Sequence, residues 1–152
     1  MQHGGLRDKV TANTDKDKPL AKLLVVDDDP DTILALKIGL INYGFLVDAF
    51  TNPEEALQKF KSNAESYCLV LLDIKMPALS GIQLAKKVKE ANPNVKVLLL
   101  TGVVIRDIEF SKVFPSTIVD GFVQKPTGIR KLTDKILSLI GETKGRSSSL
   151  KG

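Results

Sequence analysis

The chain has 152 residues, of which 43% are hydrophobic and 26% are charged, and this composition is typical of a single globular domain. Its net charge of +4 comes without a basic stripe interleaved with aromatic residues, and no apolar run could span a membrane, so binding to nucleic acid or to a membrane is disfavoured. Cys68 is the only cysteine, so no internal disulfide can form, which favours a cytoplasmic location.

Polar segments flank the part of the chain that can fold. Residues 1–19 lack the apolar stretch of a signal peptide, and we expect a disordered tail there. Residues 20–141 are predicted to form the folded domain. Residues 142–152 include the linker-like GRSSSLKG, and we expect them to form a flexible tail or the start of a linker.

The domain begins with a strand followed by a helix. The apolar run at 22–26 predicts a buried strand. The spacing of apolar residues over 30–42 predicts a helix, with Asp29 as its cap, Pro30 at its first position and Gly44 as its stop.

The alternation of strands and helices continues to the end of the domain. The second strand, at 45–49, alternates in polarity, which favours a position at the edge of the sheet. A helix over 53–63 follows it, capped by Asn52. Further strands are predicted at 69–72, 95–100 and 119–123, and further helices at 81–91, at 128–140 and, in short or irregular form, at 103–118. Five strand–helix units in this order predict a parallel sheet with helices on both faces.

Polar side chains follow four of the five predicted strands within two residues of the strand end. Asp27 and Asp28 follow the first strand, Asp73 the third, Thr101 the fourth and Lys125 the fifth. The carboxyl ends of parallel strands meet at one rim, where open α/β sheets bind ligands. Three carboxylates at that rim favour a hard cation such as Mg²⁺, and the hydroxyl and the lysine suit an anion. Together these groups indicate phosphoryl transfer.

The same residues resemble the receiver domains of response regulators in two-component signalling, which are CheY-like. The matching stretches are LLVVDDDP, LVLLDIKMPALSGIQL, VLLLTG and GFVQKP. The resemblance implies a flavodoxin-like α/β fold with five parallel strands in the order 2-1-3-4-5 and five helices. It also implies a signalling domain that catalyses only its own phosphorylation and dephosphorylation.

The resemblance further implies a role for each strand-end residue. Asp73 is implied to be the phosphoacceptor, taking its phosphoryl group from a phosphohistidine on a histidine kinase or a histidine phosphotransfer protein. Mg²⁺ is implied to bind Asp28, Asp73 and the backbone carbonyl of Lys75 directly, and Asp27 through a water molecule.

The resemblance implies that three pairs of residues control the phosphorylated state. Lys125 and Thr101 are expected to hold the phosphoryl group, and Thr101 and Phe122 to act as a switch that alters a protein-interaction surface. Phe122 can also be read as an ordinary strand residue. Lys75 and Val103 occupy positions that tune dephosphorylation, and we expect slow self-dephosphorylation because Val103 cannot orient an attacking water.

Two surfaces are candidates for protein contacts. Ala35 and Ile38 fall outside the core stripe of the first helix and form a candidate kinase-docking face, or simply a partly exposed patch. The 103–118 segment carries more apolar residues than one short helix can bury, so it forms either a homodimer or target surface or an irregular cover over the core. The apolar residues concerned are Ile105, Ile108, Phe110 and Phe114.

Two other functions compete with a phosphorylated receiver. A haloacid-dehalogenase-type phosphatase would use Asp27 and Asp29 with Thr101 and Lys125, but it would leave Asp73 unexplained and would need acids after a further strand. A receiver-like interaction module that works without phosphate is the main alternative. The output is left open, because the chain can be a stand-alone receiver or a fragment of a longer regulator, and the sequence names no downstream target.

Overall fold

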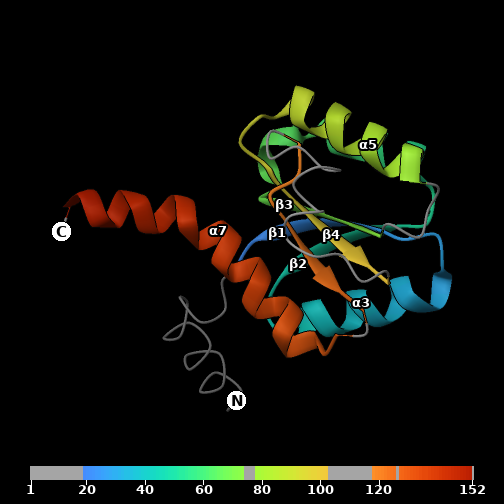
Figure 1. The fold of residues 1–152 in the computed structure, drawn as a ribbon, viewed down its shortest axis with the longest axis horizontal. Coiled ribbons are helices and arrows are strands. Elements are labelled where there is room, and N and C mark those ends of the chain that lie inside the picture. Colours follow the sequence, from blue (N-terminus) through green and yellow to red (C-terminus); the bar gives the residue numbers. More distant parts are fainter. Residues whose placement is uncertain (1–18, 74–77, 103–117, 126, 152) are drawn as a thin grey trace, which may run out of the picture.

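The computed structural model describes residues 19–73, 78–102, 118–125 and 127–151. Within these ranges five strands form one parallel sheet with the order β2-β1-β3-β4-β5 (Figure 1). The strands are β1 (Lys22–Val26), β2 (Leu46–Phe50), β3 (Leu69–Asp73), β4 (Lys96–Thr101) and β5 (Gly121–Gln124). The predicted strand order and parallel direction are confirmed, and the sheet is of the flavodoxin-like type.

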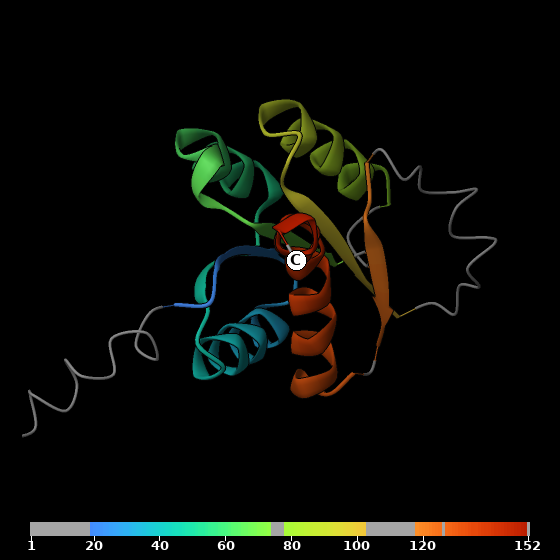
Figure 2. The same ribbon diagram turned by 90° about the vertical axis from the view of Figure 1, so that its left-hand side faces the viewer.

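The helices in the described ranges cover both faces of the sheet. They are α3 (Pro30–Asn42), α4 (Pro53–Ser62), α5 (Ala78–Ala91) and α7 (Ile129–Lys151), together with the 3-10 helix η1 (Ala64–Ser66). Helices α4 and α5 lie on one face, and α3 and α7 lie on the other (Figures 1 and 2). The fifth predicted helix, over 103–118, lies outside the described residues except for Ile118.

Each face of the sheet has its own hydrophobic core, because alternate residues of a strand point to opposite sides. Leu24 and Val26 of β1 pack towards α4 and α5. Leu23 and Val25 pack towards α3 and α7. The central strands β1 and β3 are therefore buried on both sides, which explains their continuous apolar sequence.

The edge position predicted for the second strand is confirmed. Among the described strands, β2 pairs only with β1, with Lys22 opposite Leu46 and Val26 opposite Phe50. Leu46 is 51% exposed, so this strand is not covered as β1 and β3 are.

Helix α3 matches its predicted bounds because both of its ends are specified locally. The Asp29 side chain accepts a hydrogen bond from the backbone N–H of Asp31, and Pro30 starts the helix. Gly44, at a φ of 107°, adopts the left-handed conformation that ends the helix and leads into β2.

Two helices differ from their predicted bounds by more than one residue. Helix α5 begins at Ala78 rather than at residue 81, so Gly81 lies inside the helix and not at its start. Helix α7 continues to Lys151, beyond the predicted end at residue 140. No proline follows Thr127, and a glycine such as Gly141 weakens a helix by about 1 kcal/mol without blocking it. The structure therefore extends the predicted helix to Lys151, whereas the flexible tail and the domain boundary at residue 141 stay predictions.

Long apolar helices are absent from the described part of the chain. None of the helices there is both long and hydrophobic enough to cross a membrane.

Candidate phosphoacceptor and metal site

The residues after β1 form the first half of the site. The backbone N–H of Asp27 donates to the carbonyl of Phe50, at 3.1 Å, so Asp27 prolongs the pairing of β1 with β2. Its side chain is fully buried, whereas Asp28 is exposed. The backbone N–H of Asp29 donates to Asp27 Oδ1 at 2.9 Å, and this bond orients the buried carboxylate.

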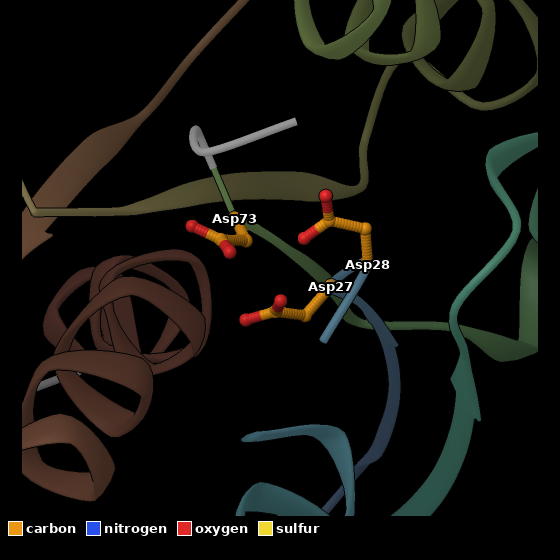
Figure 3. Close-up of side chains that lie close together, drawn as sticks. All are labelled: Asp27, Asp28 and Asp73. Carbon is orange, nitrogen blue, oxygen red and sulfur yellow. The ribbon is translucent and has the colours of Figure 1, made fainter. Parts of the chain in front are cut away.

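Asp73 brings a third carboxylate from the end of β3. It is the last residue of that strand and is only 2% exposed. One carboxylate oxygen from each of Asp27, Asp28 and Asp73 lies within 4.8 Å of the others. The three side chains converge at the end of the sheet, as Figure 3 shows. The predicted grouping of these three acids is confirmed.

The Lys125 ammonium lies between two of these acids. Its Nζ is 3.1 Å from Asp73 Oδ1 and 3.5 Å from Asp27 Oδ2. The contact with Asp73 places the lysine beside the predicted phosphoacceptor, and the contact with Asp27 was not predicted. The Lys125 backbone N–H also donates to the carbonyl of Thr101, which ties the end of β5 to the end of β4.

The alternation of strand side chains explains this grouping. Leu71 of β3 and Val123 of β5 face α3 and α7. Asp73 and Lys125 each follow one of these residues by two positions, so they lie on the same side of the sheet. Leu99 and Phe122 face α4 and α5, so Thr101, two residues after Leu99, belongs to that side.

Burial sets the electrostatics of Asp27. Desolvation raises the pKa of Asp27 to about 6, and the neighbouring Asp73 carboxylate adds to the rise. The Asp29 N–H and the Lys125 ammonium act in the opposite direction. One lysine therefore does not balance the two buried acids, and a further positive charge would stabilise the site.

The donor set fits a hard divalent cation such as Mg²⁺. Among the described residues it offers three carboxylates and no sulfur or imidazole ligand, which is the chemistry that Mg²⁺ prefers. In addition, Asp27 Oδ2 is buried, and within the described residues it has the Lys125 ammonium 3.5 Å away but receives no hydrogen bond. The residues present therefore suit both a cation and an anionic group beside Lys125.

Thr101 and Phe122 occupy neighbouring positions on one face of the sheet. Thr101 is fully buried at the end of β4, and Phe122 is half-buried against the core beneath α4 and α5. Phe122 lies opposite Leu99 of β4, and Leu99 precedes Thr101 by two residues in the same strand. Of the remaining predicted site residues, Lys75 and Val103 lie outside the described residues.

A cavity adjoins the Lys125 side of the site. Its volume is about 680 Å³, and it lies between the first turns of α3 and α7. Its lining includes Thr32, Ala35, Leu36, Lys125 and Ile129. Ile38, further along α3, is 52% exposed, so Ala35 and Ile38 lie outside the core as predicted.

Comparison with known proteins identifies the family. Residues 23–137 match the model of the response regulator receiver domain. The chain therefore belongs to this family, which consists of signalling domains of two-component systems.

Two of the curated relatives are transcriptional regulators that are longer than this chain. A homolog of the transcriptional regulatory protein CpxR from Haemophilus influenzae is 35% identical over 86% of this chain and 55% of its own length. The alkaline phosphatase synthesis transcriptional regulatory protein PhoP from Bacillus subtilis is 30% identical over 86% of this chain and 53% of its own length. The chain spans about half the length of these two relatives.

Solved structures confirm the receiver fold. A receiver domain protein from Clostridium thermocellum is 30% identical, with a TM-score of 0.72 over 82% of this chain and 98% of that one. The response regulator TrrA from Thermotoga maritima, solved in complex with Mg²⁺-BeF, is 34% identical, with a TM-score of 0.67 over 79% of this chain and 99% of that one.

Proposed function

We propose that Asp73 accepts a phosphoryl group from a phosphohistidine, carried by a histidine kinase or a histidine phosphotransfer protein, with Mg²⁺ as cofactor. The observation that carries the proposal is the convergence of Asp73 with two further carboxylates within 4.8 Å and with Lys125 at 3.1 Å. The structure of TrrA with Mg²⁺-BeF supports a Mg²⁺-dependent site in a related protein.

Asp73 is the nucleophile in this reaction. One of its oxygens forms a bond to phosphorus while the bond between phosphorus and the imidazole nitrogen breaks, and the electron pair of that bond stays on the imidazole. The product on this chain is an acyl phosphate. Bound Mg²⁺ supplies positive charge that offsets the charge of the phosphoryl oxygens. Asp28, Asp73 and the Lys75 carbonyl would hold it directly, and Asp27 would hold it through a water molecule.

Lys125 provides the second positive charge. Its ammonium already lies beside Asp73 and can pass to the phosphoryl oxygens without leaving Asp27, 3.5 Å away. The Thr101 hydroxyl would donate a hydrogen bond to a phosphoryl oxygen. Its movement would free space on the face that it shares with Phe122, so the two residues form a switch that alters the adjoining surface.

The acyl phosphate resets by hydrolysis on the same chain. Val103 offers no polar atom to orient water, and Lys75 places a cation two residues after the acceptor, so we propose a long-lived phosphorylated state. This is the only turnover that the proposal assigns to the chain, so it is a signalling domain and not an enzyme acting on external substrates.

The proposed kinase contact lies around the cavity beside Lys125. A phosphohistidine has to approach Asp73 from outside, and Ala35 and Ile38 on α3 provide exposed apolar surface near that route. The proposal includes no nucleic acid or membrane contact. The proposal places the chain in the cytoplasm, where a single cysteine stays reduced. A homodimer through the 103–118 region also stays a proposal.

Transfer from a phosphorylated histidine protein tests this function. A panel of purified histidine kinases, each labelled on its histidine, would be mixed with the chain with and without Mg²⁺. We expect label on the wild type with at least one kinase, none on Asp73→Asn, and none after chelation of Mg²⁺. Equal labelling of the wild type and Asp73→Asn would assign the phosphoryl group to another residue. Absence of transfer from every kinase, together with no reaction with a small phosphodonor, would favour a phosphate-independent module.

A further inference from the structure

Two successive turns of the same kind join the acidic cluster to helix α3. In the first turn, the carboxylate of Asp27 accepts the backbone N–H of Asp29, at 2.9 Å. In the second, the carboxylate of Asp29 accepts the backbone N–H of Asp31, at 3.1 Å. In such a turn, an aspartate side chain accepts the backbone N–H two residues later. This bond fixes the backbone between the two residues.

The Asp29 side chain is held at both oxygens. Oδ1 receives the Asp31 N–H, and Oδ2 receives the hydroxyl of Thr32 at 2.7 Å. The carbonyl of Asp29 also accepts the N–H of Ile33, the first bond of the helix, at 3.0 Å. Side chain and backbone of Asp29 are thus both bound to the first turn of α3.

Asp28 lies at the centre of this arrangement. It is the exposed member of the acidic cluster and has Asp27 and Asp29 as its two neighbours in the chain. The backbone that carries it is fixed on one side by β1 and on the other by the capped start of α3. Its position relative to Asp73 therefore depends on whether Asp29 keeps the loop attached to the helix.

We propose that Asp29 is a positioning residue for the metal site. It would act through its side-chain bonds to α3 and its backbone N–H to Asp27, and would not touch the cation itself. This inference rests on the proposed function, because it assigns to Asp29 the geometry on which Mg²⁺ binding depends.

Mg²⁺ affinity, measured by titration calorimetry on the unphosphorylated chain, is the direct readout. Loss of a residue that orients metal ligands typically weakens metal binding about ten-fold or more, so Asp29→Ala is expected to raise the Mg²⁺ dissociation constant about ten-fold. Asp29→Asn and Asp29→Ser keep a capping oxygen and are expected to stay within about two-fold of the wild type. Thr32→Val removes only the bond to Oδ2 and is expected to fall between them.

A second capped helix provides the matched control. The Asn52 side chain accepts the N–H groups of Glu54 and Glu55, at 2.8 and 3.1 Å, and so caps α4 as Asp29 caps α3. Asn52→Ala is expected to lower thermal stability to a similar degree and to leave Mg²⁺ affinity unchanged. The comparison would then separate a loss of Mg²⁺ affinity caused by lower stability from one caused by misplaced ligands.

Three results would overturn the inference. Wild-type affinity in Asp29→Ala would show that the cap does not position the cluster. An equal loss in Asp29→Asn and Asp29→Ala would assign the effect to charge. Loss in Asn52→Ala equal to that in Asp29→Ala would assign it to general stability. In each case Mg²⁺ binding by the wild type leaves the proposed function standing, whereas a wild type that binds no Mg²⁺ would overturn both.

Discussion

Asp27 shows how a single residue balances stability against function. Its carboxylate is fully buried and its pKa is raised to about 6, mainly by desolvation. A buried charge of this kind lowers the stability of the folded chain at neutral pH. A cation bound beside it would offset this cost.

The pH dependence of stability follows from this shift. The folded-state pKa of Asp27 lies above its ordinary value of 3.8, so the folded chain binds the proton more tightly than the unfolded chain. The free energy of unfolding that this group contributes is therefore greatest below the ordinary pKa, and it is lost as pH rises through about 6.

Asp27→Asn should remove the loss of folding stability that the charged Asp27 carboxylate causes. In the absence of divalent cations we expect the variant to be more stable than the wild type near neutral pH, by about 1–3 kcal/mol. The difference should vanish in acid, where Asp27 is protonated in both states. Thermal unfolding across this pH range in the presence of a chelator measures the effect. A variant that is less stable than the wild type at neutral pH would refute this account of Asp27.

The sequence allowed the strand-end residues to be predicted but not all of their contacts. Asp27, Asp28, Asp73 and Lys125 could be placed at one rim because parallel strands end together. The contact of Lys125 with Asp27 and the bond from the Asp29 N–H depend on a side-chain rotamer and on the backbone of a loop. Neither leaves a periodic pattern in the sequence, although an aspartate two residues before another polar residue is a signal for such a turn.

At the scale of elements, the contact between α3 and α7 sets one side of the site. A Cβ atom placed on Gly39 of α3 would lie 2.7 Å from Cδ1 and 2.8 Å from Cγ1 of Ile129, at the start of α7. Gly39 therefore allows the two helices to approach closely. This approach brings the first turn of α7 beside the cavity that adjoins Lys125.

Gly39→Ala tests the importance of this contact. An alanine in place of glycine inside a helix ordinarily stabilises it by about 1 kcal/mol. We expect Gly39→Ala to lose that gain and to destabilise the chain instead, because Ile129 must shift. Gly141→Ala is the control, since a Cβ there meets nothing within 4 Å, and it should raise stability. Equal stabilisation by both substitutions, measured by chemical denaturation, would argue against a tight helix contact.

Element boundaries were predictable where the chain carries its own signals. Helix α3 matches its prediction because Asp29, Pro30 and Gly44 specify its ends. The end of α7 was missed because the polar residues after 140 read as a tail, yet they include no proline to stop the helix. Local propensity at such a position does not decide between a solvated helix and a coil.

At the scale of the whole molecule, the acidic cluster would couple binding of the proposed cation to folding. Since a cation that binds only the folded chain adds to its stability, the stabilisation grows with concentration and reaches about 2.7 kcal/mol at one hundred times the dissociation constant. The cluster draws its acids from the ends of β1 and β3, so it forms only when the sheet is assembled.

Mg²⁺ should therefore raise the melting temperature of the wild type. For a domain of this size we expect a shift of about 5–10 °C near saturation. Asp28→Asn should lose most of that shift because it removes a proposed ligand. Asp134→Asn, at an exposed position on α7, should keep it. A wild-type melting temperature that is insensitive to Mg²⁺, or an equal shift in Asp28→Asn, would contradict the proposed metal site.

Intact mass spectrometry tests whether Asp73 is the phosphoacceptor. The wild type and Asp73→Asn would each be incubated with acetyl phosphate and Mg²⁺, with a chelated sample of each beside them. We predict that only the wild type with Mg²⁺ gains the mass of one phosphoryl group. The same gain in Asp73→Asn, or a gain by the wild type in the presence of chelator, would contradict the claim.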